Sequence, residues 1–222
     1  MANLIITCEH GGNRIPKKWQ DLFPAPCPEL NTHRGYDIGA LRLAKYLAEQ
    51  LSAPLFYNEV SRLLIDFNRS IGRKNQFSEF SKGLTKKNKR ELIDTYYLPY
   101  RQNIEQIISS LSPVTHLSVH SFTPELAGKV RDVDIGLLYD PKRPLEKDLA
   151  RRWKQKLPKI YRVRMNKPYL GISDGLVTEL RKQYSPSDYV GIELEVNQKI
   201  LTMETEAGNI EKTLAASLKE AL

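Results

Sequence analysis

Short runs of apolar residues alternate along this chain with longer stretches in which apolar positions follow a helical period. The short runs are rich in β-branched residues, which is typical of buried strands, and they lie at residues 4–7, 53–58, 61–67, 133–139, 160–164 and 189–198, with another ending at Val119. Apolar positions spaced three and four apart predict helices with one buried face at residues 36–51, 90–111, 145–157, 177–183 and 209–222. This alternation predicts an α/β fold, a three-layer α/β/α sandwich around a mostly parallel or mixed central sheet.

Two segments interrupt the alternation. Residues 16–31 carry four prolines and are predicted to form an irregular surface loop. Residues 70–90 contain few aliphatic and many charged side chains, so we expect a mobile loop or lid there. Pro99 lies inside the helix predicted at residues 90–111 and is expected to kink it. Residues 1–222 are otherwise expected to form a single domain.

The composition is that of an ordinary globular protein. Hydrophobic residues make up 41% and charged residues 27% of the 222 positions. No apolar run approaches the roughly 18–20 residues of a membrane span, and the first residues enter a strand without the basic region of a signal peptide. The two cysteines, Cys8 and Cys27, make no disulfide framework and indicate a reducing, cytoplasmic location. Nothing in the sequence indicates an oligomeric state.

The net charge of +8 raises the alternative of a nucleic-acid or phosphate binder. Such proteins concentrate basic residues on one face or interleave them with aromatic residues. Here the basic residues are scattered, with local clusters in "GRKNQ", "TKKNKR" and "ARRWKQK". We therefore expect no nucleic-acid partner, and a small anionic substrate fits the same charge.

Two histidines stand at the ends of apolar runs. His10 follows the first run and precedes two glycines, and His120 follows the run that ends at Val119. Sites in α/β proteins form at the carboxyl ends of strands, and catalytic zinc takes three protein ligands and leaves one position for water. We therefore predict a metal site with His10 and His120 as two of its ligands. The third ligand could be Asp37, Glu9 or His33.

Two carboxylates lie two positions apart in the apolar run "YVGIELEVNQ". The side chains of Glu193 and Glu195 therefore point to the same face of a strand. Buried carboxylates are costly without cations, so this face either meets a metal site or belongs to a solvated edge strand. A glutamate beside metal-bound water suits general-base catalysis.

Basic residues accompany two other predicted strands. Arg62, Asn68 and Arg69 occur in "SRLLIDFNRS", and an Arg–Asn combination can bind a substrate carboxylate. Arg131 precedes "IGLLYD" and either lines the pocket or belongs to a surface ion-pair cluster. Cys8 is expected to be a packed core thiol rather than a nucleophile.

Six segments resemble the N-formylglutamate amidohydrolase family when taken in order: "CEHGGNRIP", "HRGYDIGA", "SRLLIDFNRS", "VHSFTP", "DIGLLYD" and "GIELEVNQ". The resemblance runs from about residue 4 to 200. That family belongs with zinc carboxypeptidase-like and aspartoacylase-like hydrolases. The resemblance implies a phosphorylase/hydrolase-like α/β/α fold, one zinc ion per chain and hydrolysis of linear amides.

The same resemblance implies roles for individual residues. His10 and His120 are similar to zinc ligands of the family, and Asp37 falls where the remaining ligand is expected. Glu195 resembles the glutamate that activates water. Asn68 and Arg69 resemble an Asn–Arg pair that binds a substrate carboxylate in related hydrolases.

We therefore expect a cytoplasmic zinc-dependent amidohydrolase that acts on a small anionic N-acyl amino acid such as N-formylglutamate. In this hypothesis Glu195 and Arg69 are catalytic, and Arg62 and Arg131 help Asn68 and Arg69 to bind the substrate. One alternative is a zinc carboxypeptidase-like peptidase. The other is the basic nucleic-acid or phosphate binder, without hydrolase activity.

Overall fold

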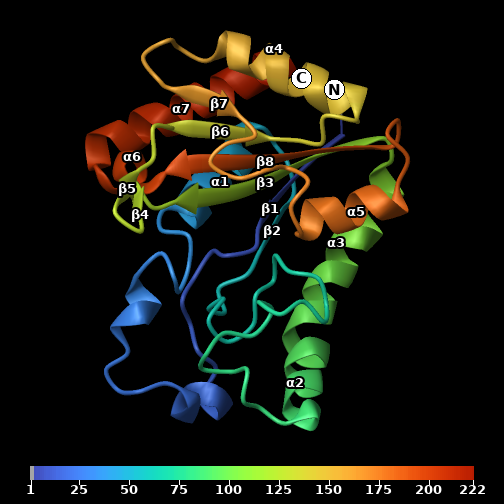
Figure 1. The fold of residues 1–222 in the computed structure, drawn as a ribbon. Helices are drawn as coiled ribbons and strands as arrows, with labels where there is room; N and C mark the ends of the chain where they lie inside the picture. Colours follow the sequence, from blue (N-terminus) through green and yellow to red (C-terminus); the bar gives the residue numbers. More distant parts are fainter. Residues whose placement is uncertain (1–2) are drawn as a thin grey trace.

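The computed structural model describes residues 3–222 and has a six-stranded sheet at its centre (Figure 1). The strands are β1 (Asn3–Cys8), β2 (Leu55–Tyr57), β3 (Val114–Phe122), β6 (Ile135–Leu138), β7 (Val163–Met165) and β8 (Tyr189–Asn197), in the spatial order β2-β1-β3-β8-β6-β7. Every neighbouring pair is parallel except β8 with β6. The sheet is therefore mixed and mostly parallel, which confirms the predicted fold class.

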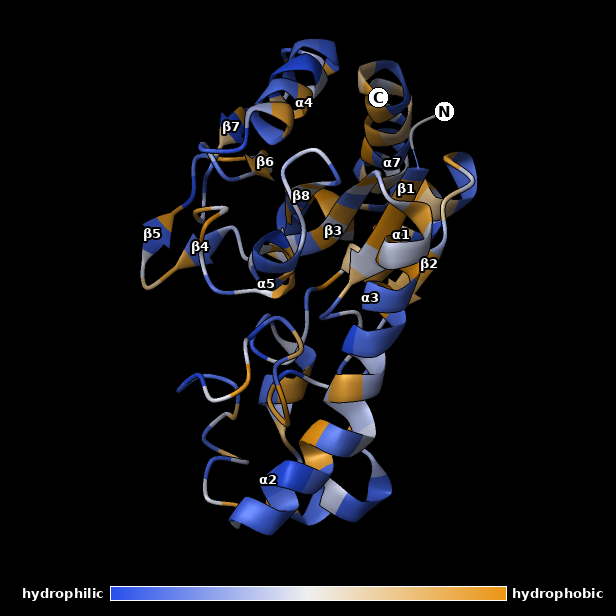
Figure 2. Cartoon of the chain, turned by 90° about the vertical axis from the view of Figure 1, so that its right-hand side faces the viewer, coloured by the Kyte–Doolittle hydropathy of each residue, from blue (hydrophilic) through white to orange (hydrophobic). Residues whose placement is uncertain are grey.

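Helices cover both faces of the sheet. One face packs against α1 (Ala40–Gln50), α4 (Pro144–Lys156) and α7 (Glu204–Ala221), and the other packs against α3 (Leu98–Leu111) and α5 (Leu176–Gln183). Figure 1 shows α4 and α7 above the sheet and α3 and α5 below it. Figure 2 shows hydrophobic residues along the strands and hydrophilic ones on the outer surfaces of α4 and α2.

The central strands β3 and β8 present apolar side chains to one face and polar side chains to the other. In β3, Leu117 and Val119 belong to the core beneath α1 and α7, so the alternation of a strand directs Ser118 and His120 to the opposite face. The parallel register pairs Ser118 with Glu193 and His120 with Glu195. All four polar side chains consequently project from the face that α3 and α5 cover.

A lobe of mostly irregular structure continues from this face. It contains two 3-10 helices, η1 (Lys17–Leu22) and η2 (Pro28–Asn31), the helix α2 (Lys86–Leu92) and a π-helical turn (Ile93–Tyr97). Its own apolar core includes Trp19, Leu64, Ile65, Phe67 and Leu92. Figure 1 shows this lobe below the sheet, beside the continuous helical column of α2 and α3.

The strand predicted at residues 61–67 is wrong. The segment forms turns, in which the Ser61 hydroxyl donates to the carbonyl of Gly35 and the Leu64 N–H donates to the carbonyl of Ser61. Leu64, Ile65 and Phe67 of this segment are buried in the core of the lobe. Burial in this second core, and not strand pairing, accounts for the apolar run.

Several element boundaries also differ from the predictions. Helix α1 begins four residues after the predicted start because Gly39, with φ 82°, precedes its first residue. Helix α2 begins at Lys86, inside the predicted loop 70–90, and Thr85 caps it. The π-helical turn lies directly before Pro99, close to the predicted kink. The mobility of residues 70–90 stays a prediction.

The sequence pattern also missed short elements: α6 (Gln198–Thr202) and the hairpin of β4 (Glu125–Leu126) and β5 (Lys129–Val130). His120 lies inside β3, which continues to Phe122. Strand β8 is paired on both sides, so it is not the solvated edge strand of the alternative interpretation. Within residues 3–222, no helix combines the length and the apolar character needed to cross a membrane.

Candidate active site

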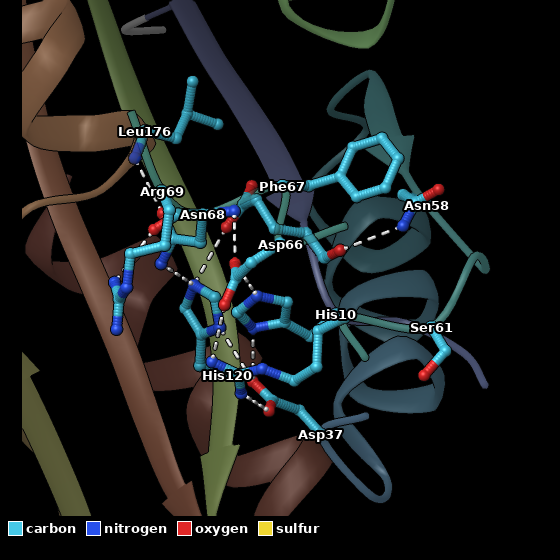
Figure 3. A network of polar contacts seen from close by, with 12 residues as sticks. His10, Asp37, Asn58, Ser61, Asp66, Phe67, Asn68, Arg69, His120 and Leu176 are labelled. Atoms are coloured by element: carbon cyan, nitrogen blue, oxygen red, sulfur yellow. Dashed lines mark hydrogen bonds and ion pairs between the residues drawn. The ribbon is translucent and has the colours of Figure 1, made fainter. Parts of the chain in front are cut away.

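His10, Asp37 and His120 converge from three separate elements. His10 follows β1, Asp37 precedes α1 and His120 lies on β3. The Nδ1 atoms of His10 and His120 lie 3.4 and 2.8 Å from the same carboxylate oxygen, Asp37 Oδ2. One ligand atom from each residue falls within 4.8 Å of the others, and all three residues are buried. Figure 3 shows both imidazole rings beside the Asp37 carboxylate.

Each histidine has a second carboxylate on the opposite side of its ring. His10 Nε2 lies 2.7 Å from Asp66 Oδ1, and His120 Nε2 lies 2.9 Å from Glu9 Oε2. Carboxylates that bind the outer nitrogen of a metal-ligating histidine fix its tautomer and orientation. Glu9 therefore lies behind His120 and not beside Asp37, which places Asp37 and not Glu9 in the group of three.

Glu9 is itself held by hydroxyl groups. Ser118 Oγ donates to Glu9 Oε2 at 2.6 Å, and the Tyr100 hydroxyl donates to Glu9 Oε1 at 3.0 Å. Burial by itself raises the pKa of the Glu9 carboxyl, but the hydrogen bond and charge of His120 lower it well below its usual range. The Glu9 carboxylate is thus ionised, and both of its oxygens have hydrogen-bond partners.

Arg62 connects the two aspartates of the site. Its guanidinium lies 3.1 Å from Asp37 Oδ1 and 3.2 Å from Asp66 Oδ2. Burial raises the pKa of both carboxyl groups, but the charges of His10 and Arg62 outweigh it and hold both pKa values well below their usual range. Burial also lowers the pKa of His120, but its hydrogen bonds to Asp37 and Glu9 raise it well above the ordinary value.

Glu193 and Glu195 line the same cavity, whose volume is about 190 Å³. Glu195 Oε2 is buried and has no hydrogen-bond partner among the described residues. Burial raises the pKa of Glu193 to about 7 and that of Glu195 to about 8, partly offset by the charge of His120. An unpartnered carboxylate with a raised pKa, next to the histidine pair, has the properties of a general base.

Asn68 and Arg69 line the cavity on the far side of His120 from Asp37. Asn68 Nδ2 lies 3.3 Å from His120 Nε2, and its Oδ1 accepts a hydrogen bond from the backbone of Leu176. Arg69 Nη1 donates to the carbonyls of Asn68 and Asp174. Within residues 3–222 Arg69 pairs with no carboxylate, so its charge is available to an anion in the cavity.

The remaining predicted residues lie outside this cavity. Arg131 stacks between the rings of Phe122 and Tyr169 and donates to the Tyr169 hydroxyl at 2.9 Å. Tyr169 lines the cavity and Arg131 does not, so the ring of Tyr169 lies between Arg131 and the cavity. His33 lines an adjoining hollow instead of joining the histidine pair. Cys8 is buried in the main core, and burial raises the pKa of its thiol well above the ordinary value.

The residues present fit a divalent metal ion such as zinc. Two imidazole nitrogens and a carboxylate oxygen form a usual donor set for catalytic zinc. His10 Nδ1 is buried and has no hydrogen-bond partner in the part of the chain that the structure describes. A metal ion would satisfy this nitrogen.

Sequence reasoning missed the outer partners of the two histidines. Asp66 lies in the segment that contains Asn68 and Arg69, but no local pattern links it to His10. Ser118 precedes His120 by two positions in β3, and this spacing on one strand is a signal that could have identified it. Tyr100 lies on α3, and its contact with Glu9 depends on packing that the sequence does not encode locally.

The α/β/α fold, with a buried cluster of two histidines and an aspartate at the carboxyl ends of parallel strands, defines a hydrolase-type active site. The chain belongs to the N-formylglutamate amidohydrolase family, whose model matches residues 2–202. It is accordingly an enzyme, a hydrolase that acts on amides.

Two solved structures are similar to this chain. A gene product of Agrobacterium tumefaciens has 26% sequence identity and a TM-score of 0.85, with 99% of this chain and 90% of that chain covered. An N-formylglutamate amidohydrolase from Ralstonia eutropha has 18% identity and a TM-score of 0.71, with 99% and 93% covered. The second similarity concerns the fold alone. A comparison with curated proteins found no match.

Proposed function

We propose that this protein is a zinc-dependent amidohydrolase that cleaves the amide bond of a small N-acyl amino acid, with N-formylglutamate as the first candidate. The observation that carries the proposal is the convergence of His10 Nδ1, His120 Nδ1 and Asp37 Oδ2 in a buried cavity. The family to which the chain belongs supports the choice of an amide as the substrate.

His10, Asp37 and His120 would hold one zinc ion per chain, and Asp66 and Glu9 would orient the two imidazoles. When bound, zinc polarises the acyl carbonyl and lowers the pKa of a coordinated water towards about 7. Arg62 holds Asp37 and Asp66 in place through its two ion pairs. We therefore assign Arg62 a positioning role, in place of the direct substrate contact expected from the sequence.

Glu195 is the general base in this proposal. Its carboxylate takes a proton from the water that attacks the acyl carbonyl, and it later gives this proton to the amide nitrogen as the C–N bond breaks. The products are a carboxylic acid and an amino acid with a free amine. Two features support the role: the unpartnered Oε2 atom and the position of Glu195 directly opposite His120 on the neighbouring strand.

Arg69 and Asn68 bind the carboxylate of the amino acid. Arg69 brings a guanidinium without an ion-pair partner among the described residues, and a planar guanidinium can bind a carboxylate through two hydrogen bonds. Backbone contacts with Asn68 and Asp174 hold this side chain at the cavity wall. A substrate bound there has its amide near the histidine pair.

Replacing each of the two neighbouring glutamates tests the proposal. We expect Glu195→Gln to lower kcat for N-formylglutamate by roughly 10²–10⁴-fold, the usual contribution of a general base. Zinc content, measured by elemental analysis, should be unchanged because Glu195 is not a ligand. Glu193→Gln is the matched control on the same face of β8 and should lower kcat by less than tenfold.

Turnover of the Glu195→Gln variant close to that of the wild type would remove Glu195 from the mechanism. A larger loss in Glu193→Gln would transfer the role to Glu193. Short peptides assayed beside N-formylglutamate distinguish this activity from a carboxypeptidase, because only a peptidase would prefer them.

A further inference from the structure

A second hollow, with a volume of about 300 Å³, opens beside the cavity that contains the histidine pair. Asp37, Arg62, Ser121 and Tyr169 line both spaces, so the two adjoin one another. We refer to this second space as the side hollow. It holds none of the residues that we assign to carboxylate binding or proton transfer, and the proposed mechanism leaves it unused.

Apolar side chains form one part of the wall of the side hollow, and polar or charged side chains form the rest. Phe122 follows His120 by two positions in β3 and therefore continues the row of side chains on the active-site face. Leu126, on β4, and Tyr169 line it from the other sides, with 46% and 43% of their surfaces exposed. Arg131 lies 5.6 and 5.0 Å from the rings of Phe122 and Tyr169 and holds the two rings in place.

Leu126 and Tyr169 are exposed, whereas Phe122 is only 2% exposed and forms a buried part of the wall. Exposed apolar groups that gather in one place often mark a binding site. Leu170 and Ile172, next to Tyr169, are each 57% exposed. Figure 2 shows the β4–β5 hairpin, which carries Leu126, projecting from the body of the protein with hydrophobic residues on it. Ala127 and Gly128, with φ values of 50° and 73°, form its tight turn.

The two arginines that line the side hollow are already paired with carboxylates. Arg34 forms an ion pair with Glu79, and Arg62 forms one with Asp37. Neither arginine offers a free charge to a second carboxylate of the substrate. The pairing of both arginines, together with the exposed side chains of Leu126 and Tyr169, favours an uncharged, apolar group on that side of the hollow.

The contacts of His120 show which end of the substrate reaches the side hollow. Asn68 approaches the ring at Nε2, and Asp37 approaches it at Nδ1, the other side of the imidazole. Arg69 follows Asn68, whereas Asp37 lines the side hollow. Figure 3 shows Arg69 and Asp37 on opposite sides of the His120 ring. A substrate with its carboxylate at Arg69 and its amide at the histidine pair would extend its acyl group past Asp37.

We propose that the side hollow binds the acyl group of the substrate, and that this group is an apolar chain or ring larger than formyl. The inference rests on the proposed function. A formyl group is comparable in size to one or two water molecules, each of which takes roughly 30 Å³ in the liquid. It would leave most of the side hollow to solvent, whereas a hexanoyl or benzoyl group would contact Phe122, Leu126 and Tyr169.

A series of N-acyl glutamates with one amino acid and a varied acyl group tests this inference. The zinc-loaded enzyme is assayed with the formyl, acetyl, hexanoyl, benzoyl and succinyl compounds. We expect kcat/KM to be at least tenfold higher for the hexanoyl or benzoyl compound than for the formyl compound, because more apolar surface is buried. Calorimetry with the metal-free protein, which does not turn the compounds over, should show the same order of affinity.

Leu126→Trp partly fills the side hollow from an exposed hairpin, where a larger side chain leaves the core intact. It should lower the hexanoyl-to-formyl ratio of kcat/KM, and of affinity, by tenfold or more. Leu145→Trp is the matched control, since Leu145 on α4 is similarly exposed and lines neither space. It should leave the ratio unchanged.

Three results would overturn the inference. A preference for formyl would show that the side hollow takes no acyl group, and a preference for succinyl would show that the group is anionic. An equal ratio in wild type and Leu126→Trp would remove the hollow from substrate selection. Hydrolysis of none of the five compounds would instead contradict the proposed function itself, so the two failures are distinguishable.

Discussion

At the scale of single residues, the site is built from buried charges that neutralise one another. Asp37 lies between two imidazoles and Arg62, and the outer nitrogens of the imidazoles meet Asp66 and Glu9. Burying any one of these groups alone would be costly. A cation among His10, Asp37 and His120 would complete the balance of charge.

In the proposed function, the protonation of His120 would make metal binding dependent on pH. In the metal-free protein, Asp37 and Glu9 raise the pKa of His120 well above its ordinary value, so the ring carries two protons at neutral pH. A ligating imidazole must be neutral, and binding therefore releases a proton. We expect zinc affinity to increase with pH, by up to about tenfold per unit, until the pH exceeds the pKa of His120.

Competition titrations with a chelator at pH 6 and pH 8 measure this effect, once the pH dependence of the chelator is subtracted. Calorimetry in two buffers with different ionisation enthalpies counts the protons released. Affinity that is equal at both pH values, or higher at pH 6, would show that His120 is not a protonated group that the metal displaces.

The sequence alone predicts the residues at strand ends but not their mutual contacts. His10 and His120 follow apolar runs, and Glu195 shares a strand face with Glu193, so their placement follows from local periodicity. The pairing of His10 with Asp66 joins residues 56 positions apart. It depends on the turns at residues 61–67, whose apolar run resembles a strand.

At the scale of elements, β8 lies at the point where the sheet changes from parallel to antiparallel pairing. Its neighbour β6 contributes Gly136, which stands opposite Glu195. A Cβ atom on Gly136 would lie 2.1 Å from the carbonyl oxygen of Lys167 and 3.2 Å from the Cβ atom of Glu195. The absence of a side chain at this position lets the segment before Tyr169 pass close to the sheet.

Two glycine-to-alanine replacements test this packing, because they are expected to change the free energy of unfolding in opposite directions. Gly136→Ala should lower the free energy of unfolding by about 1–3 kcal/mol, because the methyl group overlaps backbone. Gly208→Ala, in α7, meets no atom within 4 Å and should raise it by about 0.5–1 kcal/mol through helix propensity. Urea denaturation of both variants checks the pair, and a stable Gly136→Ala protein would contradict the close approach at β6.

Long periodic segments were predicted well, and short or irregular ones were not. Helix α4 and strand β8 follow directly from the spacing of their apolar residues. The pattern also finds α7 and β3, but α7 begins five residues before the predicted start and β3 continues past His120 to Phe122. The lobe was not predicted as a separate core, because its apolar residues come from turns and short helices without a regular period. The β4–β5 hairpin was missed because each of its strands has only two residues.

At the scale of the whole molecule, two cores meet at the site. The sheet provides His120, Glu193 and Glu195 on one face, and the lobe provides Asp66, Asn68 and Arg69. The chain carries a net charge of +8, whereas the carboxylates that line the cavity outnumber its arginines. In the proposed function, the net positive charge would attract a small anionic substrate over a distance, and Arg69 would then bind it.

Metal analysis of the purified protein tests the account most directly. Wild type, His120→Ala and the control His33→Ala, which replaces a histidine outside the cluster, are expressed with zinc, dialysed and measured by elemental analysis. The account predicts about one zinc per chain in wild type and His33→Ala, and little in His120→Ala, because catalytic zinc needs three protein ligands. Equal zinc in all three proteins, or none in the wild type, would contradict it.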